Sequence, residues 1–453
     1  MDTLVKPGPI VAIVGAGPAG FYVAEALLQS LPDAQMHMFE RTAAPHGLVR
    51  YGVAPDHQKL KQVAAVFEGI ASHERFRLHA GVDVGRDLGL SELRARSHAV
   101  VLTTGAALGR PLGVPGESLP QVFSSAAFVG WYNGHADHAG LRPDLGADSA
   151  VIVGNGNVAL DVCRLMVRAF DDLAASDIPQ PMLETFRHRG IRKVHLLGRG
   201  APGAVKFTFK EFRQLADLPN VRIRLPQVAA FTPAMWEQAA SPDAKRVLQW
   251  LRAEQERPVD AADDRLTVNL WFNVAPIAFV GEQTLQEVRV RSTGGDAFVI
   301  PAGIAVTCVG YACRPIADAP GYDAAGAMRH RAGQVLDDDG HDEAGLFVAG
   351  WAKRGPTGII GTNRACGYET AATLVAALPA LTDAAPTLAS DFGPLLDARG
   401  IVRLGHADWQ RLDAHEKARG AALGKPREKL LSLDDALRVL SAVRSAGAPA
   451  PAP

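Results

Sequence analysis

Two glycine-rich turns constrain the fold of this chain most strongly, because each lies between a short apolar strand and a helix rich in alanine and leucine. The first turn covers residues 15–20 (GAGPAG), and the second covers residues 154–159 (GNGNVA). Such a turn brings backbone N–H groups to the start of a helix, where a pyrophosphate is bound favourably. Two turns of this kind predict two dinucleotides in one molecule, and therefore electron transfer between them.

Strands and helices alternate along the rest of the chain. The hydrophobic pattern predicts strands at 10–14, 35–39, 76–84, 99–102, 151–153, 193–197 and 346–350, with several short strands between 266 and 307. It predicts helices at 19–30, at about 58–72 and at 358–378, and a polar insertion at 171–192. Alternation of this kind favours a parallel sheet with crossover helices, so we expect an α/β fold with two Rossmann-like, doubly wound domains.

The bulk composition narrows the functional classes. A chain of 453 residues predicts two or three domains, and a net charge of −1 gives no general attraction to nucleic acid or to an anionic membrane. The four cysteines form no Cys-x-x-Cys pair, which disfavours a disulfide reductase and a zinc site, and no metal site is predicted. No targeting segment or membrane-spanning stretch is recognisable, so the expected compartment is the cytoplasm.

The first glycine turn carries the features of a site for FAD or NAD. Gly15 permits the tight turn, Gly17 allows close approach of the pyrophosphate, and Gly20 allows the helix to pack against the strand. Glu40 follows Gly20 by about twenty residues at a predicted strand end, where its carboxylate accepts hydrogen bonds from ribose hydroxyls. A carboxylate there disfavours a 2′-phosphate, which argues against NADP at this turn.

The second glycine turn has the opposite charge at the corresponding strand end. Its third small residue is Ala159, and the next predicted strand is followed by Arg199, with Lys206 and Lys210 shortly after. An arginine in place of the acid is what a 2′-phosphate requires. The second turn is therefore predicted to bind NADP(H).

Four sequence blocks together resemble the ferredoxin–NADP reductases of the adrenodoxin-reductase type. They are residues 15–20, the loop 47–57 (GLVRYGVAPDH), residues 154–161 and residues 350–363 (GWAKRGPTGIIGTN). A C-terminal stretch from Trp409 to Arg427 is also similar, so the resemblance covers essentially the whole chain apart from its tail.

The resemblance implies an NADP-binding domain inserted into a discontinuous FAD-binding domain. The expected bounds are 1–107 and 329–444 for the FAD domain and 108–328 for the NADP domain, with a disordered tail at 445–453. The residues expected to bind FAD are Gly15, Gly17, Ala19, Gly20, Glu40, Leu48, Val84, Trp351, Gly358, Ile359 and Ile360. Those expected to bind NADP(H) are Gly154, Asn155, Gly156, Asn157, Arg199, Glu211 and Gly358.

The resemblance also implies the reaction. NADPH would transfer a hydride to FAD, and the electrons would then pass one at a time to a ferredoxin-type iron–sulfur protein. His57 and Asp161 match a pair that the family places near the flavin and the partner-facing cleft, and they are the predicted catalytic residues. Gly358 is expected to open a helix whose N-terminus points at the flavin.

One departure from the family pattern affects coenzyme preference. The family commonly has two consecutive arginines where this chain has Arg199 followed by Gly200. The missing charge-assisted hydrogen bond contributes about 1.5–3 kcal/mol where it is present. We therefore expect a preference for NADPH over NADH that is weaker than in the family.

A basic cluster is a candidate docking surface for an acidic ferredoxin. It consists of Arg187, His188, Arg189, Arg192 and Lys193, together with Arg213, and an ordinary solvated face explains these residues at least as well.

Other functions stay open at this point. One is an electron-input subunit or diaphorase with another acceptor, resembling the small subunit of glutamate synthase. Those chains carry cysteine-rich cluster ligands before the first glycine turn, and no cysteine precedes Ile10 here. Another is a nucleotide-binding scaffold without turnover.

Overall fold

The computed structural model describes residues 8–226, 238–255, 264–323, 326–382, 386 and 391–446. The chain forms two compact units. Unit 1 comprises Met1–Val53, His57–Leu108 and Tyr311–Pro453, and unit 2 comprises Ala54–Asp56 and Gly109–Gly310. A middle segment is thus inserted into a unit built from both ends of the chain. The inserted segment ends at Gly310, whereas the predicted boundary is residue 328.

Unit 1 is built on a seven-stranded sheet with the order β16-β17-β18-β4-β1-β2-β3. The five strands from β18 to β3 are parallel, and β16, β17 and β18 are antiparallel to one another. The strands are β1 (Ile10–Val14), β2 (Gln35–Glu40), β3 (Phe76–Ala80), β4 (Ala99–Leu102), β16 (His330–Arg331), β17 (Gln334–Leu336) and β18 (Asp342–Val348).

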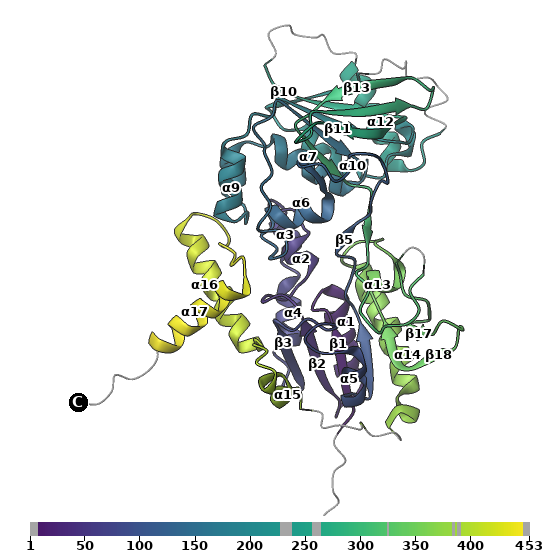
Figure 1. The fold of residues 1–453 in the computed structure, drawn as a ribbon, viewed down its shortest axis with the longest axis vertical. Helices are drawn as coiled ribbons and strands as arrows, with labels where there is room; N and C mark the ends of the chain where they lie inside the picture. The colour runs from purple at the N-terminus through teal and green to yellow at the C-terminus, as the bar shows by residue number, and fades with distance from the viewer. Residues whose placement is uncertain are drawn as a thin grey trace, which may run out of the picture. The chain divides into compact units, whose positions relative to one another are not determined.

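Alternate side chains of β1 are buried on opposite faces of this sheet, which explains why the sequence of β1 is apolar throughout. Val11 and Ile13 belong to one core cluster, and Ala12 and Val14 belong to a second. Helices α1 and α14 lie side by side over the first cluster (Figure 1). The helices of unit 1 are α1 (Pro18–Ser30), α2 (Leu48–Tyr51), α3 (Gln58–Lys61), α4 (Ala64–Ala71), α5 (Leu90–Arg96), α13 (Trp351–Arg354), α14 (Thr362–Thr382), α15 (Phe392–Ala398), α16 (His406–Ala422) and α17 (Leu433–Ala446).

Unit 2 contains a six-stranded parallel sheet with the order β6-β14-β7-β8-β10-β9, and an antiparallel sheet β11-β12-β13 packs with it. The strands are β6 (Val122–Ser124), β7 (Ser149–Val153), β8 (Lys193–Leu197), β9 (Val221–Arg224), β10 (Leu266–Trp271), β11 (Val274–Val280), β12 (Glu287–Ser292), β13 (Ala297–Pro301) and β14 (Ile304–Thr307). The helices are α6 (Ser125–Tyr132), α7 (Asn157–Val167), α8 (Phe170–Ala174), α9 (Gln180–Arg187), the 3₁₀ helix η1 (Pro202–Ala204), α10 (Phe209–Ala216) and α12 (Pro242–Gln255). Strands β5 (Leu108–Gly109) and β15 (Tyr311–Ala312) form a separate two-stranded sheet.

Most of the predicted elements are present, and several differ. The strand expected at 76–84 ends at Ala80. The helix expected at about 58–72 is divided into α3 and α4, and the insertion 171–192 contains α8 and α9. The helix expected from Gly358 begins at Thr362, because Gly358 has a φ of +85° and cannot be helical. Residues 445–446 end α17, so the predicted tail starts too early, and its remaining residues lie outside the described part of the chain.

The predicted fold class is confirmed: two Rossmann-like α/β units, one inserted into the other. Among the described residues, no helix has both the length and the apolar run needed to cross a membrane.

Candidate functional site: two glycine turns

The three glycines of the first turn differ in the space around them. Gly15 has a φ of +109°, and a Cβ there would lie 2.6 Å from the carbonyl oxygen of Thr103. A Cβ on Gly20 would lie 2.2 Å from the carbonyl oxygen of Gly15, so this glycine permits close contact of α1 with the turn. A Cβ on Gly17 would meet nothing within 4 Å. The surface beside Gly17 is therefore open, which fits the close approach of a dinucleotide pyrophosphate.

Glu40 ends β2 directly beside this turn. Its Oε2 accepts a hydrogen bond from the backbone N–H of Ala16 (3.0 Å), and its Oε1 accepts from the N–H and hydroxyl of Thr42 (2.9 Å each). A carboxylate offers about four acceptor positions, so Oε2 keeps capacity for a ribose hydroxyl. The protein thus orients the carboxylate as a site for adenosine ribose requires.

Two further loops pack against the first turn. The N–H of His46 donates to the carbonyl of Ala16 (2.7 Å), and a Cβ on Gly47 would lie 3.0 Å from the Cα of Gly17. A Cβ on Gly350 would lie 2.5 Å from the Cβ of Ala19. Segments that are far apart in sequence therefore meet at this turn.

A buried ion pair fixes the loop that follows Gly47. Arg50 donates to both carboxylate oxygens of Glu416 in α16, at 2.8 and 2.5 Å, and the two side chains are 4% and 1% exposed. Glu416 also accepts from Arg427 (3.1 Å) and from the N–H of Leu430 (2.8 Å). Burial opposes ionisation of Glu416, yet Arg50 and Arg427 hold its pKa below its ordinary value. Arg50 and Glu416 both lie in segments quoted for the family resemblance, but nothing in the sequence pairs them.

Glu68 makes a second link between this loop and α16. Its oxygens lie 3.0 Å from His46 Nε2, 2.9 Å from His406 Nε2 and 2.7 Å from Trp409 Nε1. Burial raises the pKa of Glu68, but these hydrogen bonds outweigh burial and lower it to about 2.

The lowered pKa of Glu68 predicts a stability change in acid. A carboxyl group whose pKa is lowered by folding stabilises the protein fully above its unfolded pKa of about 4.5, and this contribution is lost as the pH falls toward about 2. The free energy of unfolding of the wild type should therefore exceed that of Glu68→Gln by a constant amount above pH 5. The difference should shrink below pH 4. Urea unfolding of both proteins between pH 6 and pH 3 measures it, and a difference independent of pH contradicts the expectation.

The remaining residues expected at FAD lie in unit 1 with varied exposure. Val84 is buried, Leu48 is the first residue of α2, and Ile359 is 74% exposed. Trp351 is the first residue of α13, and its Nε1 donates to the carbonyl of Thr357 (3.0 Å). Ile360 packs partly against the core of unit 1.

The second turn repeats the geometry of the first. Gly154 has a φ of +136°, and a Cβ there would lie 2.3 Å from the carbonyl oxygen of Cys308, at the end of the neighbouring strand. Gly156 is the N-cap of α7, and a Cβ there would meet nothing within 4 Å. Gly156 carries no side chain that could cap the first N–H groups of α7, which fits a pyrophosphate at this helix end.

The loop after β8 returns to this second turn. The N–H of Lys206 donates to the carbonyl of Asn155 (3.1 Å), and the N–H of Thr208 donates to Oδ1 of Asn157 (2.9 Å). Arg199 lies just after β8, is exposed, and makes no ion pair with any described residue. Its guanidinium is thus available to a phosphate.

Arg164 contacts three acidic residues of unit 2, and the sequence did not reveal its role. It is fully buried, and its Nε and Nη2 each donate to the carboxylate of Asp56 at 2.8 Å. Its Nη1 donates to Asp161 (2.7 Å) and lies 3.9 Å from Glu211. The sequence contains one sign of this role. Arg164 is a single arginine, three residues after Asp161, in a helix whose other buried side chains are mostly apolar.

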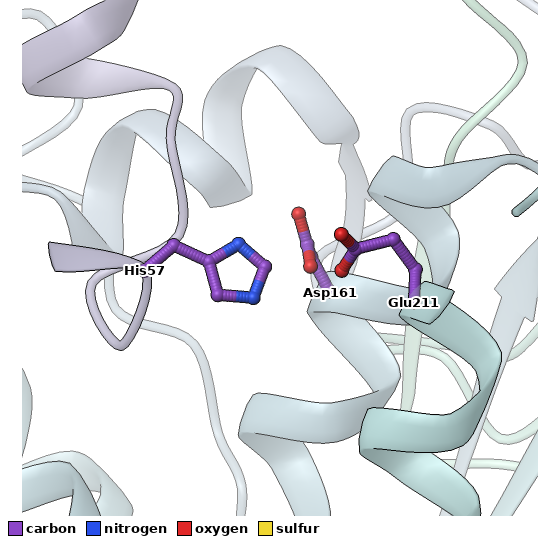
Figure 2. A group of neighbouring side chains, drawn as sticks. All are labelled: His57, Asp161 and Glu211. Carbon is purple, nitrogen blue, oxygen red and sulfur yellow. The ribbon is translucent and has the colours of Figure 1, made fainter. Parts of the chain in front are cut away.

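Figure 2 shows Asp161 of α7 and Glu211 of α10 with their carboxylates turned toward one another, within 4.8 Å. His57 is drawn in the same figure. It occupies the N-cap of α3 and directly follows Asp56, the residue that Arg164 holds.

Three of the six residues in the basic cluster predicted for docking form ion pairs. Arg187 pairs with Glu184 (3.1 Å), Lys193 with Asp148 (3.2 Å), and Arg213 with Asp217 (2.8 Å). These exposed pairs weaken the positive potential expected there.

The chain is similar to several characterised proteins. Residues 9–196 match the family described as pyridine nucleotide-disulphide oxidoreductase. The chain is 37% identical to bovine mitochondrial NADPH:adrenodoxin oxidoreductase (Bos taurus) over 95% of its own length and 92% of that protein. It is also 37% identical to a probable ferredoxin/ferredoxin–NADP reductase of Mycobacterium bovis, over 98% of its length and 77% of that protein.

A solved structure agrees with these relatives. Mycobacterium tuberculosis FprA in complex with NADPH superposes with a TM-score of 0.87 and 34% identity, over 95% of this chain and 99% of that one. All four cysteines, Cys163, Cys308, Cys313 and Cys366, are free in this structure. The chain belongs to the adrenodoxin-reductase-type family of ferredoxin–NADP(+) reductases.

Proposed function

We propose that this protein passes electrons from NADPH through FAD to a ferredoxin-type iron–sulfur protein. The observation that carries the proposal is the opposite charge beside two turns of the same geometry. Glu40 stands at the first turn and suits an unphosphorylated ribose, whereas Arg199 stands at the second and suits a 2′-phosphate. When bound, NADPH and FAD supply the hydride and one-electron chemistry.

The side chains of this chain bind and orient the two coenzymes. Gly17 and Gly156 leave room for the pyrophosphates at the starts of α1 and α7, and Glu40 would hold the ribose of FAD. His57 and Asp161 keep the catalytic roles that the resemblance implies, and Arg164 fixes the carboxylate of Asp161. The relatives support a ferredoxin as the electron acceptor, and the four free cysteines support a reducing compartment such as the cytoplasm.

The direct test uses the purified flavoprotein. Anaerobic addition of NADPH should bleach the flavin absorption band, and cytochrome c should be reduced rapidly only when a ferredoxin is also present. An unchanged flavin spectrum would indicate a nucleotide-binding scaffold without turnover. Rapid cytochrome c reduction without ferredoxin would instead support a diaphorase with another acceptor.

Arg199 should determine the preference for NADPH. Arg199→Ala removes charge-assisted hydrogen bonds to the 2′-phosphate, each contributing about 1.5–3 kcal/mol, so kcat/KM for NADPH should fall by about 10- to 100-fold. The value for NADH should change by less than about threefold, because NADH lacks that phosphate.

The test measures kcat/KM for NADPH and for NADH with the wild type, Arg199→Ala and Gly200→Arg. Gly200→Arg adds a second guanidinium and should raise the ratio of the NADPH to the NADH value. An equal fall for both coenzymes in Arg199→Ala would show that Arg199 acts elsewhere.

A further inference from the structure

Gly200 leaves one arginine after β8, although the phosphate expected there carries nearly two negative charges. A phosphate ester such as the 2′-phosphate of NADPH has a charge of about −1.5 to −2 at neutral pH. Arg199 supplies a single positive charge. A Cβ on Gly200 would have the Cβ of Ala204 as its nearest neighbour, at 3.4 Å, so the protein supplies no polar group in place of the missing side chain. We therefore looked for a second cation at another position of the same loop.

The loop that follows β8 brings Lys206 back to the second glycine turn. At the start of the loop, a Cβ on Gly198 would lie 3.1 Å from Nδ2 of Asn155. At its end, the N–H of Lys206 donates to the carbonyl of Asn155 (3.1 Å). Arg199 and Lys206 are therefore both held close to the same residue of the turn.

The backbone around Lys206 is fixed while its side chain is exposed. The neighbours Val205 and Phe207 are buried, and the N–H of Thr208 donates to Oδ1 of Asn157 (2.9 Å). Lys206 is exposed between these two buried residues. Its side chain can thus be changed without disturbing the residues that hold the loop in place.

The charge of Lys206 is not neutralised by a neighbouring carboxylate. Lys206 makes no ion pair with any residue that the structure describes, whereas other exposed cations of unit 2 do. Lys193 pairs with Asp148 (3.2 Å), and Arg213 pairs with Asp217 (2.8 Å). A lysine ammonium on its flexible stem binds phosphate as a point charge. Lys206 is therefore available to an anionic ligand.

We propose that Lys206 binds the 2′-phosphate of NADP(H) together with Arg199, and so supplies the second cation that Gly200 does not. The inference rests on the proposed function, because it assigns the second turn to NADP(H). A lysine lacks the bidentate fork of an arginine, so the proposal agrees with a preference for NADPH that is weaker than two arginines would give.

Equilibrium binding tests the proposal without turnover. The FAD-loaded protein is titrated calorimetrically with NADP⁺ and with NAD⁺. Lys206→Gln should weaken binding of NADP⁺ by about tenfold and of NAD⁺ by less than about threefold, because NAD⁺ lacks the 2′-phosphate. Lys206→Arg should keep the wild-type preference. Adding Gly200→Arg to Lys206→Gln should restore the affinity for NADP⁺, because it returns a second cation to the loop.

Two further variants are the controls. Lys210→Gln removes the same charge from α10, four residues later in the chain, and should weaken binding of NADP⁺ by less than about threefold. Arg289→Gln, at an exposed arginine of β12 paired with Glu287, should bind both coenzymes like the wild type. Lys206 and Lys210 are exposed, so their variants are expected to fold.

Three results would overturn the proposal. The first is wild-type affinity of Lys206→Gln for NADP⁺. The second is an equal loss of affinity for NADP⁺ and NAD⁺, which would place Lys206 at the pyrophosphate. The third is a loss of preference in Lys210→Gln but not in Lys206→Gln, which would make Lys210 the second cation.

The proposed function is tested separately by bleaching of the flavin with NADPH. If the wild type prefers NADP⁺ and loses this preference in Lys206→Gln, but its flavin stays oxidised, only the proposed function is wrong. If the wild type binds NADP⁺ and NAD⁺ equally, both proposals are wrong.

Discussion

Replacing Gly156 by valine should abolish the use of NADPH while leaving the fold and bound FAD in place. The backbone of Gly156 is extended, with φ −106° and ψ 176°, and a Cβ there would meet no protein atom within 4 Å. The new side chain would instead occupy the space through which the pyrophosphate reaches the start of α7. Because several charge-assisted hydrogen bonds are lost together, kcat/KM for NADPH should fall by about 100-fold or more.

The same variant should change the free energy of unfolding by only about 1 kcal/mol, the usual effect of an N-cap substitution. Urea unfolding and the flavin content of the purified protein measure this. Gly154→Val is the matched control, since its Cβ would lie 2.3 Å from the carbonyl oxygen of Cys308 and its φ is +136°. That variant should be destabilised strongly. If Gly156→Val reduces its flavin with NADPH at the wild-type rate, the second turn does not hold the coenzyme.

Replacing Arg50 by alanine should destabilise unit 1 by about 3–5 kcal/mol and promote loss of FAD. The substitution leaves the carboxylate of Glu416, which is 1% exposed, without its principal counter-charge. The same change frees the loop that packs on Gly17, where the pyrophosphate of FAD is expected. Urea unfolding and flavin release during gel filtration are the measurements.

An exposed ion pair of the same unit provides the control for Arg50. Arg399 and Glu92 are 37% and 35% exposed, and an exposed pair contributes about 0–1 kcal/mol. Arg399→Ala should therefore unfold close to the wild type and retain its FAD. If Arg50→Ala also has little effect on unfolding and on flavin retention, the ion pair between Arg50 and Glu416 is not needed for FAD binding.

Local sequence patterns predicted the backbone geometry of the two glycine turns and the position of Glu40 beside the first. Gly15, Gly154 and Glu40 could be placed because turn, helix start and strand end lie within a short stretch of chain. The pairing of Arg50 with Glu416 could not be predicted, because it joins distant residues through the packing of α16. Arg164 was missed for a related reason, since its partner Asp56 lies far away in sequence.

The incorrect helix start at Gly358 shows the limit of periodicity as a signal. The apolar pattern of α14 extends toward Gly358, but the φ of +85° at that residue is a property of the turn, which periodicity does not report. The break between α3 and α4 is a different case. Gln62 and Val63 keep helical dihedral angles, but the N–H groups of Ala65 and Val66 bind the carbonyls three residues back, so the regular α-helical hydrogen bonds are interrupted there.

Because unit 1 is built from both ends of the chain, the two units can fold at different times during synthesis. Strand β4 pairs with β1 and with β18, which begins at Asp342. Arg50 can form its ion pair only after Glu416, 366 residues later in the chain, has been synthesised. All the strands of the six-stranded sheet of unit 2 lie between Val122 and Thr307. During synthesis from the N-terminus, unit 2 has its whole sheet before unit 1 does. The nascent chain can thus complete the unit expected to bind NADP(H) before it completes the unit expected to bind FAD.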